Sequence, residues 1–500
     1  MKQGGSRFAG GLFPLIAALC IQALLLFYRL DLLPVWGDEA FTLQVAPRPL
    51  GEIVGMVQRD IHPPLYYFLL HWWSWLPLPW TGVAALRAFS CVAALAATVL
   101  LDRFWLARWR PAHRWPALAL FAYSPCLLLY GRMARSYALQ MALALAAISL
   151  LWRWMRAPRE IVRRALPALA AVVALLYTHY LPGIALLAAF CLTAWRLIGW
   201  RRVAAFAAAA AVTYAPWIVT LRGALRAWGA GGGFQSTYTF TGSAVAETVL
   251  KIGAALASLT IGESFAALSL LLVPLLLALV SRGLRAHALG PSLRPILAVS
   301  AAIGYIGATR WVTWPFVAAR LLWLLPFLVL AAAIGLARLS PVWRTAAVSV
   351  ILASFASSMV LYYRTEDFLN LGYAAPVREI AAQLRRDVAP GDVVLVDGYN
   401  TDVQGLHYYL GRDVRLFAVR AETAPAAEDA ARNARVIWAV RNTRDVSPGH
   451  LVSRVEGDSC RGRSRSSEFY EPYAWWQRRA IRLVTGAEPP EFFYQVTTCR

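Results

Sequence analysis

Lysine is almost absent from this chain of 500 residues, in which only Lys2 and Lys251 occur, and charged residues of every kind make up just 15%. Hydrophobic residues make up 59%. A water-soluble fold cannot bury so large a share, whereas a membrane protein with several spans turns much of it toward lipid. The sequence therefore predicts a polytopic α-helical membrane protein, because a helix satisfies its own backbone hydrogen bonds in lipid.

The net charge of +22 reflects 49 basic against 27 acidic residues, a balance also found in nucleic-acid-binding proteins. The arginines, however, stand at the ends of apolar runs, where the positive-inside rule and the snorkelling of long side chains account for them. We therefore expect membrane lipids as partners and no nucleic acid.

Cysteine motifs for zinc or redox chemistry are missing, since the sequence has no CxxC and no Cys/His zinc spacing. Four cysteines lie inside apolar runs and should behave as small hydrophobic residues: Cys20, Cys91, Cys126 and Cys191. The sequence also has no glycine-rich phosphate motif and no internal repeat.

Uncharged runs long enough to cross the roughly 30 Å hydrocarbon core recur along the chain. The first, Phe8–Tyr28, lacks a small-residue cleavage site, so we interpret it as a retained span rather than a signal peptide. Reading from charge to charge gives eleven candidate spans, at residues 8–28, 84–101, 116–130, 136–152, 165–178, 181–195, 203–221, 264–281, 295–309, 319–337 and 345–363.

Arginine clusters between the runs indicate the orientation. They comprise Arg103, Arg108, Arg110 and Arg114; Arg153, Arg156, Arg159, Arg163 and Arg164; Arg196, Arg201 and Arg202; and Arg282, Arg285 and Arg294. With the N-terminus in the cytoplasm, every cluster falls on the cytoplasmic side. The same rule makes residues 62–79 a helix in the outer interface, and it divides residues 165–195 into two short helices at His179–Pro182.

Residues 364–500 are richer in charge and alternate helical with strand-like patterns, as in GDVVLVDG and RVIWAV. We expect residues 1–363 to form the membrane domain, with an outer loop at 29–83, and residues 364–500 to form a small α/β domain on the outer side. Cys460 and Cys499 would then share an oxidising compartment, and we predict a disulfide that closes a loop of about 40 residues.

Residue types capable of chemistry gather on the predicted outer face. Asp38 and Glu39, in VWGDEAFTL, stand where the first span ends. An ionisable residue beside a membrane is a functional candidate by default, and a solvated acidic cap is the alternative. Asp60 and His62 precede a diproline that fixes the backbone and starts the interfacial helix.

Arg132 and Arg135, in YGRMARSYAL, are three residues apart at a predicted helix start, with Tyr137 nearby. Their planar guanidinium groups suit a phosphate, and snorkelling to lipid headgroups is the alternative. Arg320, in PFVAARLLWLLP, is another outer arginine that can reach an anion.

Three further residues are candidates for the same outer cavity. His179, followed by Tyr180 in LLYTHYLPG, is either a hydrogen-bonded helix end or a metal ligand. Arg87 is either structural or pairs with Asp38 or Asp60. The sequence names no cofactor, and a divalent metal held by His179 and Asp60 is left open.

Outward carboxylates, anion-binding arginines and an apolar scaffold fit the transfer of a group from a lipid phosphate to a hydroxyl. A carboxylate can take the hydroxyl's proton, and arginines can stabilise the phosphate as it leaves. A transporter or flippase of lipid-linked sugars is the alternative, although such proteins often carry internal repeats.

The order of these motifs resembles the bacterial members of glycosyltransferase family 39, which are related to protein O-mannosyltransferases and to the aminoarabinose transferases that modify lipid A. The motifs are Asp-Glu after the first span, D-x-HPPLYY, GRMARSYAL, THY, PFVAAR and PGDVVLVD. The resemblance implies a GT-C fold in the bacterial inner membrane, with the active site and C-terminal domain on the periplasmic or outer side. It also implies an inverting transfer of sugar from a polyprenyl phosphate.

The resemblance implies roles for individual residues as well. Asp38 matches the acidic position that activates the acceptor hydroxyl, and Asp60 and His62 match a second motif that lines the same cavity. Relatives often have Arg-Tyr in the late span, whereas Arg320 is followed here by Leu321. We therefore expect catalysis from Asp38, Glu39 and Asp60; donor-phosphate binding by His62, Arg132, Arg135, Tyr137 and Arg320; and cavity positions for Arg87, His179 and Tyr180.

Overall fold

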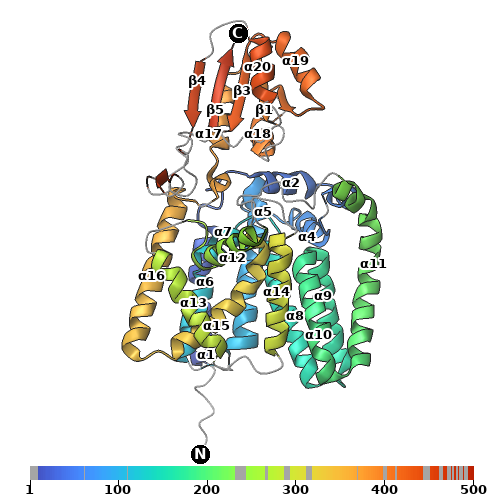
Figure 1. The fold of residues 1–500 in the computed structure, drawn as a ribbon, viewed down its shortest axis with the longest axis vertical. Helices are drawn as coiled ribbons and strands as arrows, with labels where there is room; N and C mark the ends of the chain where they lie inside the picture. The colour runs from blue at the N-terminus through green and yellow to red at the C-terminus, as the bar shows by residue number, and fades with distance from the viewer. Residues whose placement is uncertain are drawn as a thin grey trace, which may run out of the picture. The chain divides into compact units, whose positions relative to one another are not determined.

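The computed structural model divides the chain into two compact units. The membrane unit lies within Met1–Leu30 and Gln44–Tyr362, and the C-terminal unit comprises Asp31–Leu43 and Tyr363–Arg500 (Figure 1). The structure describes residues 9–60, 62–107, 109, 111–230, 244–264, 269–285, 293–310, 318–368, 370–397, 402–411, 414–442, 451–460, 465–469 and 494–499, with 475, 478, 479, 482 and 488.

The described part of the membrane unit is helical throughout. Its α-helices are α1 (Ala9–Phe27), α3 (Leu50–Arg59), α4 (Leu65–Trp73), α5 (Gly82–Leu101), α6 (Pro111–Ala122), α7 (Pro125–Gly131), α8 (Tyr137–Arg156), α9 (Leu166–Thr178), α10 (Tyr180–Ile198), α11 (Trp200–Ala230), α12 (Ala244–Ile261), α13 (Ser269–Arg285), α14 (Leu293–Arg310), α15 (Leu325–Ala337) and α16 (Pro341–Arg364). Two π-helical turns, η1 (Asp102–Leu106) and η2 (Ile161–Ala165), and a 3₁₀ segment, η3 (Ala318–Leu324), extend α5, α9 and α15.

Seven helices of the described residues are long and apolar enough to cross a membrane, and two shorter apolar helices accompany them. The predicted count of eleven spans is therefore not confirmed. The predicted span at 116–130 is interrupted, because α6 ends at Ala122 and α7 begins at Pro125. Proline lacks a backbone donor and holds the preceding residue, Ser124, in an extended conformation with ψ 126°.

The break predicted at His179–Pro182 is present. His179 has extended backbone angles, φ −161° and ψ 119°, between α9 and α10, and Pro182 stands in the first turn of α10. Within residues 62–79, the helix α4 has only nine residues, which is too short to cross the hydrocarbon core.

Helices α13 and α15 approach each other closely at two glycines. A Cβ atom on Gly335 would lie 2.8 Å from the carbonyl carbon of Leu279, and one on Gly283 would lie 2.7 Å from that of Ala331. Each contact is with backbone, which cannot move aside as a side chain can. Small residues that let two backbones meet are typical of helix pairs in membranes.

One arginine that we predicted as a cytoplasmic linker residue is buried instead. Arg114, in the first turn of α6, donates from Nε to Oδ1 of Asp102 at 2.7 Å and from Nη2 to Oδ2 at 2.8 Å. Its side chain is 7% exposed and that of Asp102 is fully buried. Arg114 therefore connects α6 to η1, and its position is set by an ion pair rather than by water or headgroups.

The C-terminal unit contains a five-stranded sheet, as the alternating patterns predicted (Figure 1). Its strands are β1 (Val393–Asp397), β2 (Leu416–Val419), β3 (Ile437–Asn442), β4 (Arg465–Phe469) and β5 (Tyr494–Cys499), in the order β2-β1-β3-β5-β4. β1 is parallel to β2 and β3, with Val394 opposite Leu416 and Trp438, while β5 is antiparallel to β3 and β4.

Helices cover both faces of this sheet. α17 (Val377–Asp387) and α18 (Asp402–Leu410) share a hydrophobic core with one face, and α19 (Ala424–Arg432) and α20 (Leu451–Ser459) share a core with the other. A short 3₁₀ turn, η4 (Leu371–Ala374), precedes α17. The predicted disulfide is confirmed: Cys460 and Cys499 are bonded, with Cα atoms 5.7 Å apart.

The segment Asp31–Leu43 packs on the C-terminal unit although it is distant in sequence. The Val35 N–H donates to the hydroxyl of Tyr409 at 2.9 Å, and Arg378 Nη2 donates to the Asp31 carbonyl at 2.7 Å. A Cβ on Gly405 would lie 2.6 Å from the Val35 carbonyl oxygen, so the contact requires glycine.

Candidate active site

Asp60 and His62 stand together at the end of α3. Asp60 is the C-terminal cap residue of that helix, and His62 Nδ1 lies 2.9 Å from Asp60 Oδ2 and 2.7 Å from the Asp60 carbonyl oxygen. Burial by itself would raise the pKa of the Asp60 carboxyl, but the hydrogen bond from His62 and the charge of Arg135 outweigh it and lower that pKa. Asp60 is therefore ionised at neutral pH.

Arg135 continues this pair into a chain of three residues, which we call the Asp60–His62–Arg135 relay. Arg135 Nη2 lies 2.9 Å from His62 Nε2, and Arg135 Nη1 donates to the Tyr67 hydroxyl at 3.2 Å. A guanidinium only donates, so His62 Nε2 accepts, and the imidazole hydrogen is on Nδ1, directed to Asp60. The relay thus fixes the tautomer of His62 and the orientation of Arg135.

His179 and Arg320 adjoin the relay. His179 Nδ1 accepts the Leu181 N–H at 3.2 Å, as the N-terminal cap of α10, which leaves Nε2 to donate. Burial lowers the pKa of His179 well below its usual value, and the positive charges of Arg320 and Arg135 lower it further. Arg320 and Asp60 also lie close enough to Tyr180 to act electrostatically on its hydroxyl.

Buried hydrogen bonds from α5 and α8 hold this cluster in place. Ser90 donates to the Arg135 carbonyl at 3.3 Å and is bonded to the Tyr66 hydroxyl at 3.0 Å. Gln140, which is fully buried, donates to the Ala319 carbonyl at 3.0 Å and so holds the residue directly before Arg320. The result is a group of donors and cations from the segment between α3 and α4, the segment between α7 and α8, the N-terminal cap of α10 and η3.

Two of the predicted arginines, Arg132 and Arg87, donate to backbone carbonyls at the end of α1. Arg132 Nη2 donates to the carbonyls of Tyr28, at 2.9 Å, and of Arg29, and its guanidinium lies over the Tyr362 ring. Arg87 Nη1 donates to the Leu30 carbonyl at 3.0 Å. Both arginines are buried and satisfy carbonyls that the end of a helix leaves without partners.

Asp38 and Glu39 occupy the first turn of α2 (Gly37–Val45), and they belong to the C-terminal unit whereas the relay belongs to the membrane unit. The Asp38 side chain is partly exposed and Glu39 is buried. Carboxylates in a first helical turn are stabilised by the positive end of the helix dipole. Their catalytic role stays a prediction.

Glu263 is a buried carboxylate that our sequence analysis missed. It follows α12 and accepts a hydrogen bond from the Tyr130 hydroxyl, and the Tyr130 ring packs edge-on against Tyr137. A signal was available, because GES interrupts two apolar runs just before our predicted span at 264–281. Tyr130, directly before the GRMARSYAL motif, thus contacts an acid from the segment after α12.

Within the residues that the structure describes, His, Cys, Asp and Glu side chains form no group of three or more that could hold a metal ion. Asp60 and His179 are each bound to protein partners, with His179 Nε2 as the available imidazole nitrogen.

The fold matches solved membrane transferases. No protein-family model and no curated protein matched the sequence. ArnT from Cupriavidus metallidurans, solved with undecaprenyl phosphate, is 13% identical, with a TM-score of 0.56 over 97% of this chain and 98% of that one. Archaeal oligosaccharyltransferase AglB from Archaeoglobus fulgidus, solved with an inhibitory peptide and a dolichol-phosphate, is 11% identical, with a TM-score of 0.52 over 99% of this chain and 89% of that one. Arabinofuranosyltransferase AftD from Mycobacteria is 16% identical, with a TM-score of 0.50 over 98% of this chain and 41% of that one.

These neighbours are glycosyltransferases of the GT-C fold, and at such low identity the likeness establishes the fold alone. Together with the apolar helices, it defines the chain as a multi-pass membrane protein with the GT-C architecture.

Proposed function

We propose that this protein is an inverting glycosyltransferase of the family 39 type, which moves a sugar from a polyprenyl phosphate to an acceptor hydroxyl at the outer face of a bacterial inner membrane. The observation that carries the proposal is the donor-rich cluster of Arg135, His62, His179 and Arg320 in a GT-C fold. A cluster of cations and N–H donors beside apolar helices suits a phosphate whose lipid tail lies in the membrane.

In this proposal Arg135 and Arg320 hold the donor phosphate. When the bond between the anomeric carbon and the phosphate oxygen breaks, the electron pair remains on the phosphate, and fixed positive groups stabilise that charge without reorganising. The relay supports Arg135 for this role, because Asp60 and His62 restrict its guanidinium. Arg132 is a weaker candidate, since it donates to the end of α1.

The acceptor hydroxyl must lose its proton as the new bond forms, which requires a base. We propose Asp38 as that base, with Glu39 beside it, because the lowered pKa of Asp60 makes that carboxylate a poor proton acceptor near neutral pH. Asp60 then acts as a positioning residue for His62 and Arg135.

The experiment is transfer by the purified full-length protein, supplied with a panel of polyprenyl-phosphate sugars and hydroxyl acceptors and followed by mass spectrometry of the products. Asp38→Asn should lower turnover about 10²–10⁴-fold with little change in donor affinity, as expected for loss of a general base. Arg320→Gln should lower turnover by about 10² or more, as expected for a group that stabilises the leaving phosphate.

Two matched controls come from an exposed ion pair at the start of α3. Arg48 and Glu52 are 3.8 Å apart, with side chains 54% and 58% exposed, so Arg48→Gln and Glu52→Gln should leave turnover unchanged. Near-normal turnover of Asp38→Asn together with an inactive Asp60→Asn would assign the base to Asp60. Movement of the donor across a bilayer without any product would instead identify a flippase.

A further inference from the structure

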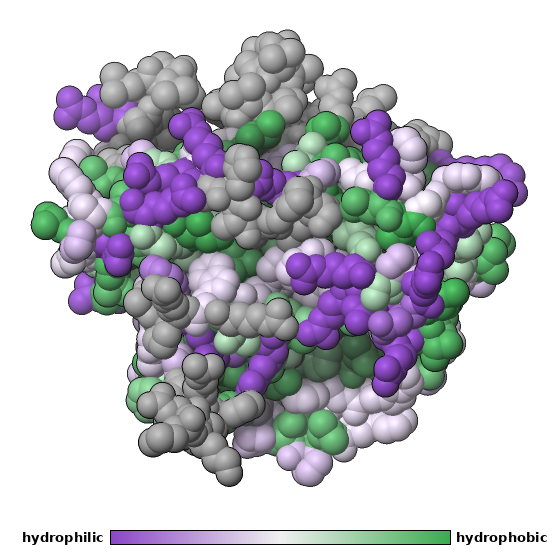
Figure 2. All heavy atoms as spheres, turned by 90° about the horizontal axis from the view of Figure 1, so that it is seen from below, coloured by the Kyte–Doolittle hydropathy of each residue, from purple (hydrophilic) through white to green (hydrophobic). Residues whose placement is uncertain are grey.

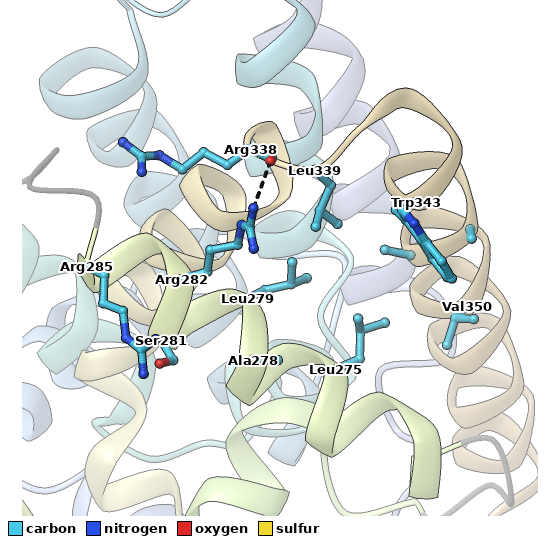
Figure 3. Close-up of a pocket in the computed structure, with 12 residues that line it drawn as sticks. Leu275, Ala278, Leu279, Ser281, Arg282, Arg285, Arg338, Leu339, Trp343 and Val350 are labelled. Carbon is cyan, nitrogen blue, oxygen red and sulfur yellow. Dashed lines mark hydrogen bonds between the residues drawn. The ribbon is translucent and has the colours of Figure 1, made fainter.

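A groove of about 760 Å³ lies in the membrane unit between α13, the end of α15 and the start of α16 (Figure 3). Its apolar wall includes Leu275 and Ala278 from α13 and Ala346 and Val350 from α16. Ala278 and Ala346 are exposed, so the groove opens to the surroundings of the helices rather than to the protein interior.

Three arginines gather at one end of this groove. Arg282 and Arg285 stand in the last turn of α13 and Arg338 follows α15, and all three are exposed. In Figure 3 they lie toward one side, while Leu275, Trp343 and Val350 lie toward the other. Arg282 Nη2 also donates to the Arg338 carbonyl at 3.3 Å, which joins the two helix ends.

This groove is far from the candidate active site. Arg320 stands near the start of the candidate span Ala318–Ala337, and Arg338 immediately follows its end. Eighteen residues of helix extend roughly 27 Å, which is close to the thickness of the hydrocarbon core. The two arginines therefore stand at opposite ends of this candidate span. Figure 2, seen from below Figure 1, shows hydrophilic side chains among hydrophobic ones on the face viewed from that side.

We propose that the groove is a binding site for an anionic phospholipid, whose phosphate lies among Arg282, Arg285 and Arg338 and whose acyl chain lies along α13 and α16. The charge of the arginines is complementary to the phosphate, and the apolar wall is complementary to the chain. Trp343, 68% exposed at the start of α16, has the amphipathic side chain that favours the headgroup level.

The close packing of α13 and α15 supports this assignment. The approach at Gly283 and Gly335 sets the spacing of the two helix ends and hence of the arginines they carry. The site is thus formed by backbone contacts before any lipid arrives, and little ordering of the protein opposes binding.

The test is native mass spectrometry of the full-length protein, titrated with phosphatidylglycerol and with phosphatidylcholine of the same acyl chains. We expect phosphatidylglycerol to bind more tightly. Each arginine near a membrane surface is worth roughly a five-fold change in affinity, so the variant with Arg282, Arg285 and Arg338 all replaced by Gln should bind it roughly 100-fold more weakly.

A matched control replaces Arg196, Arg201 and Arg202 with Gln, which removes the same charge from exposed helix ends on the same predicted side. This variant should keep its phosphatidylglycerol affinity. Ala278→Trp, which fills the groove and keeps the arginines, should weaken binding as well. Size-exclusion profiles and melting temperatures check that each variant is folded.

Four results would overturn the proposal. Equal affinities for the two lipids would remove the role of charge, and equal losses in the two arginine variants would show a diffuse surface effect. Tighter binding of undecaprenyl phosphate, or equal competition by soluble glycerol phosphate, would assign the groove to a different ligand. Because binding is measured without donor sugar or turnover, the outcome is independent of the proposed transferase activity.

Discussion

Removing one partner of the buried pair Asp102 and Arg114 should destabilise the membrane unit far more than removing both. The Arg114 guanidinium makes two parallel hydrogen bonds to the Asp102 carboxylate, at 2.7 and 2.8 Å. The Arg114 side chain is 7% exposed and the Asp102 side chain 0%. A charge left alone at such a site has almost no water to replace its partner. Asp102→Leu or Arg114→Met should each lower the free energy of unfolding by about 3–5 kcal/mol.

The double variant should behave differently, because it leaves no buried charge. Replacing an enclosed ion pair with apolar residues of similar size is often neutral or stabilising. Asp102→Leu combined with Arg114→Met should therefore lie within about 1 kcal/mol of the parent protein or above it. The resulting coupling energy, about 5 kcal/mol or more, would be large for a single pair.

The assay is reversible unfolding of the full-length protein in one detergent, followed by far-ultraviolet circular dichroism. The exposed pair Arg48 and Glu52, 3.8 Å apart, is the control, and its single variants should change the free energy by less than about 0.5 kcal/mol. The reasoning fails if each buried single variant costs less than about 1 kcal/mol, or if the double variant costs the sum of the two.

Two further predictions concern packing and pH. Gly335→Ala should lower the free energy of unfolding by about 1–3 kcal/mol, because the new Cβ meets the backbone of Leu279. Gly253→Ala is the control and should not destabilise the protein, because nothing lies within 4 Å of its Cβ. Equal melting temperatures for the two variants would contradict the close approach of α13 and α15. In the C-terminal unit, burial alone would raise the pKa of Asp392, but bonds from Arg435, the Ala389 N–H and Trp438 lower it. The ionised form of Asp392 therefore contributes stability above the unfolded pKa of about 3.9, and this stability is lost as pH falls through the lowered folded pKa. Melting curves should show that Asp392→Asn is clearly destabilising at pH 7 and progressively less so below about pH 4. A loss of stability that does not depend on pH would contradict this role.

The sequence predicted the class of fold because that depends on composition and local pattern. Uncharged runs must be helical in lipid, and seven of them are long helices in the structure. The strands GDVVLVDG and RVIWAV were predicted correctly for the same reason, since period and polarity are local properties. The pair Cys460–Cys499 was predicted correctly because both cysteines were expected in one oxidising compartment.

The sequence also placed Asp60 next to His62, since residues two apart at a helix end are neighbours in any fold. It could not choose the partners of the arginines. Arg135 reaches His62 across 73 residues, whereas Arg132, only three residues earlier, donates to the end of α1. Nothing in YGRMARSYAL distinguishes the two, because both have the same charge and reach.

By itself, then, the sequence determined that long apolar helices recur along the chain, that a mixed helix and strand region follows them, and which short motifs are adjacent. The tertiary structure alone decided that Arg114 is buried with Asp102, that Asp31–Leu43 packs on the C-terminal unit, and that Arg282 meets Arg338 beside a lipid-sized groove. The physical reason is that hydropathy acts on each segment separately, whereas a guanidinium binds whichever carbonyl or carboxylate the packing of distant helices brings within about 3 Å.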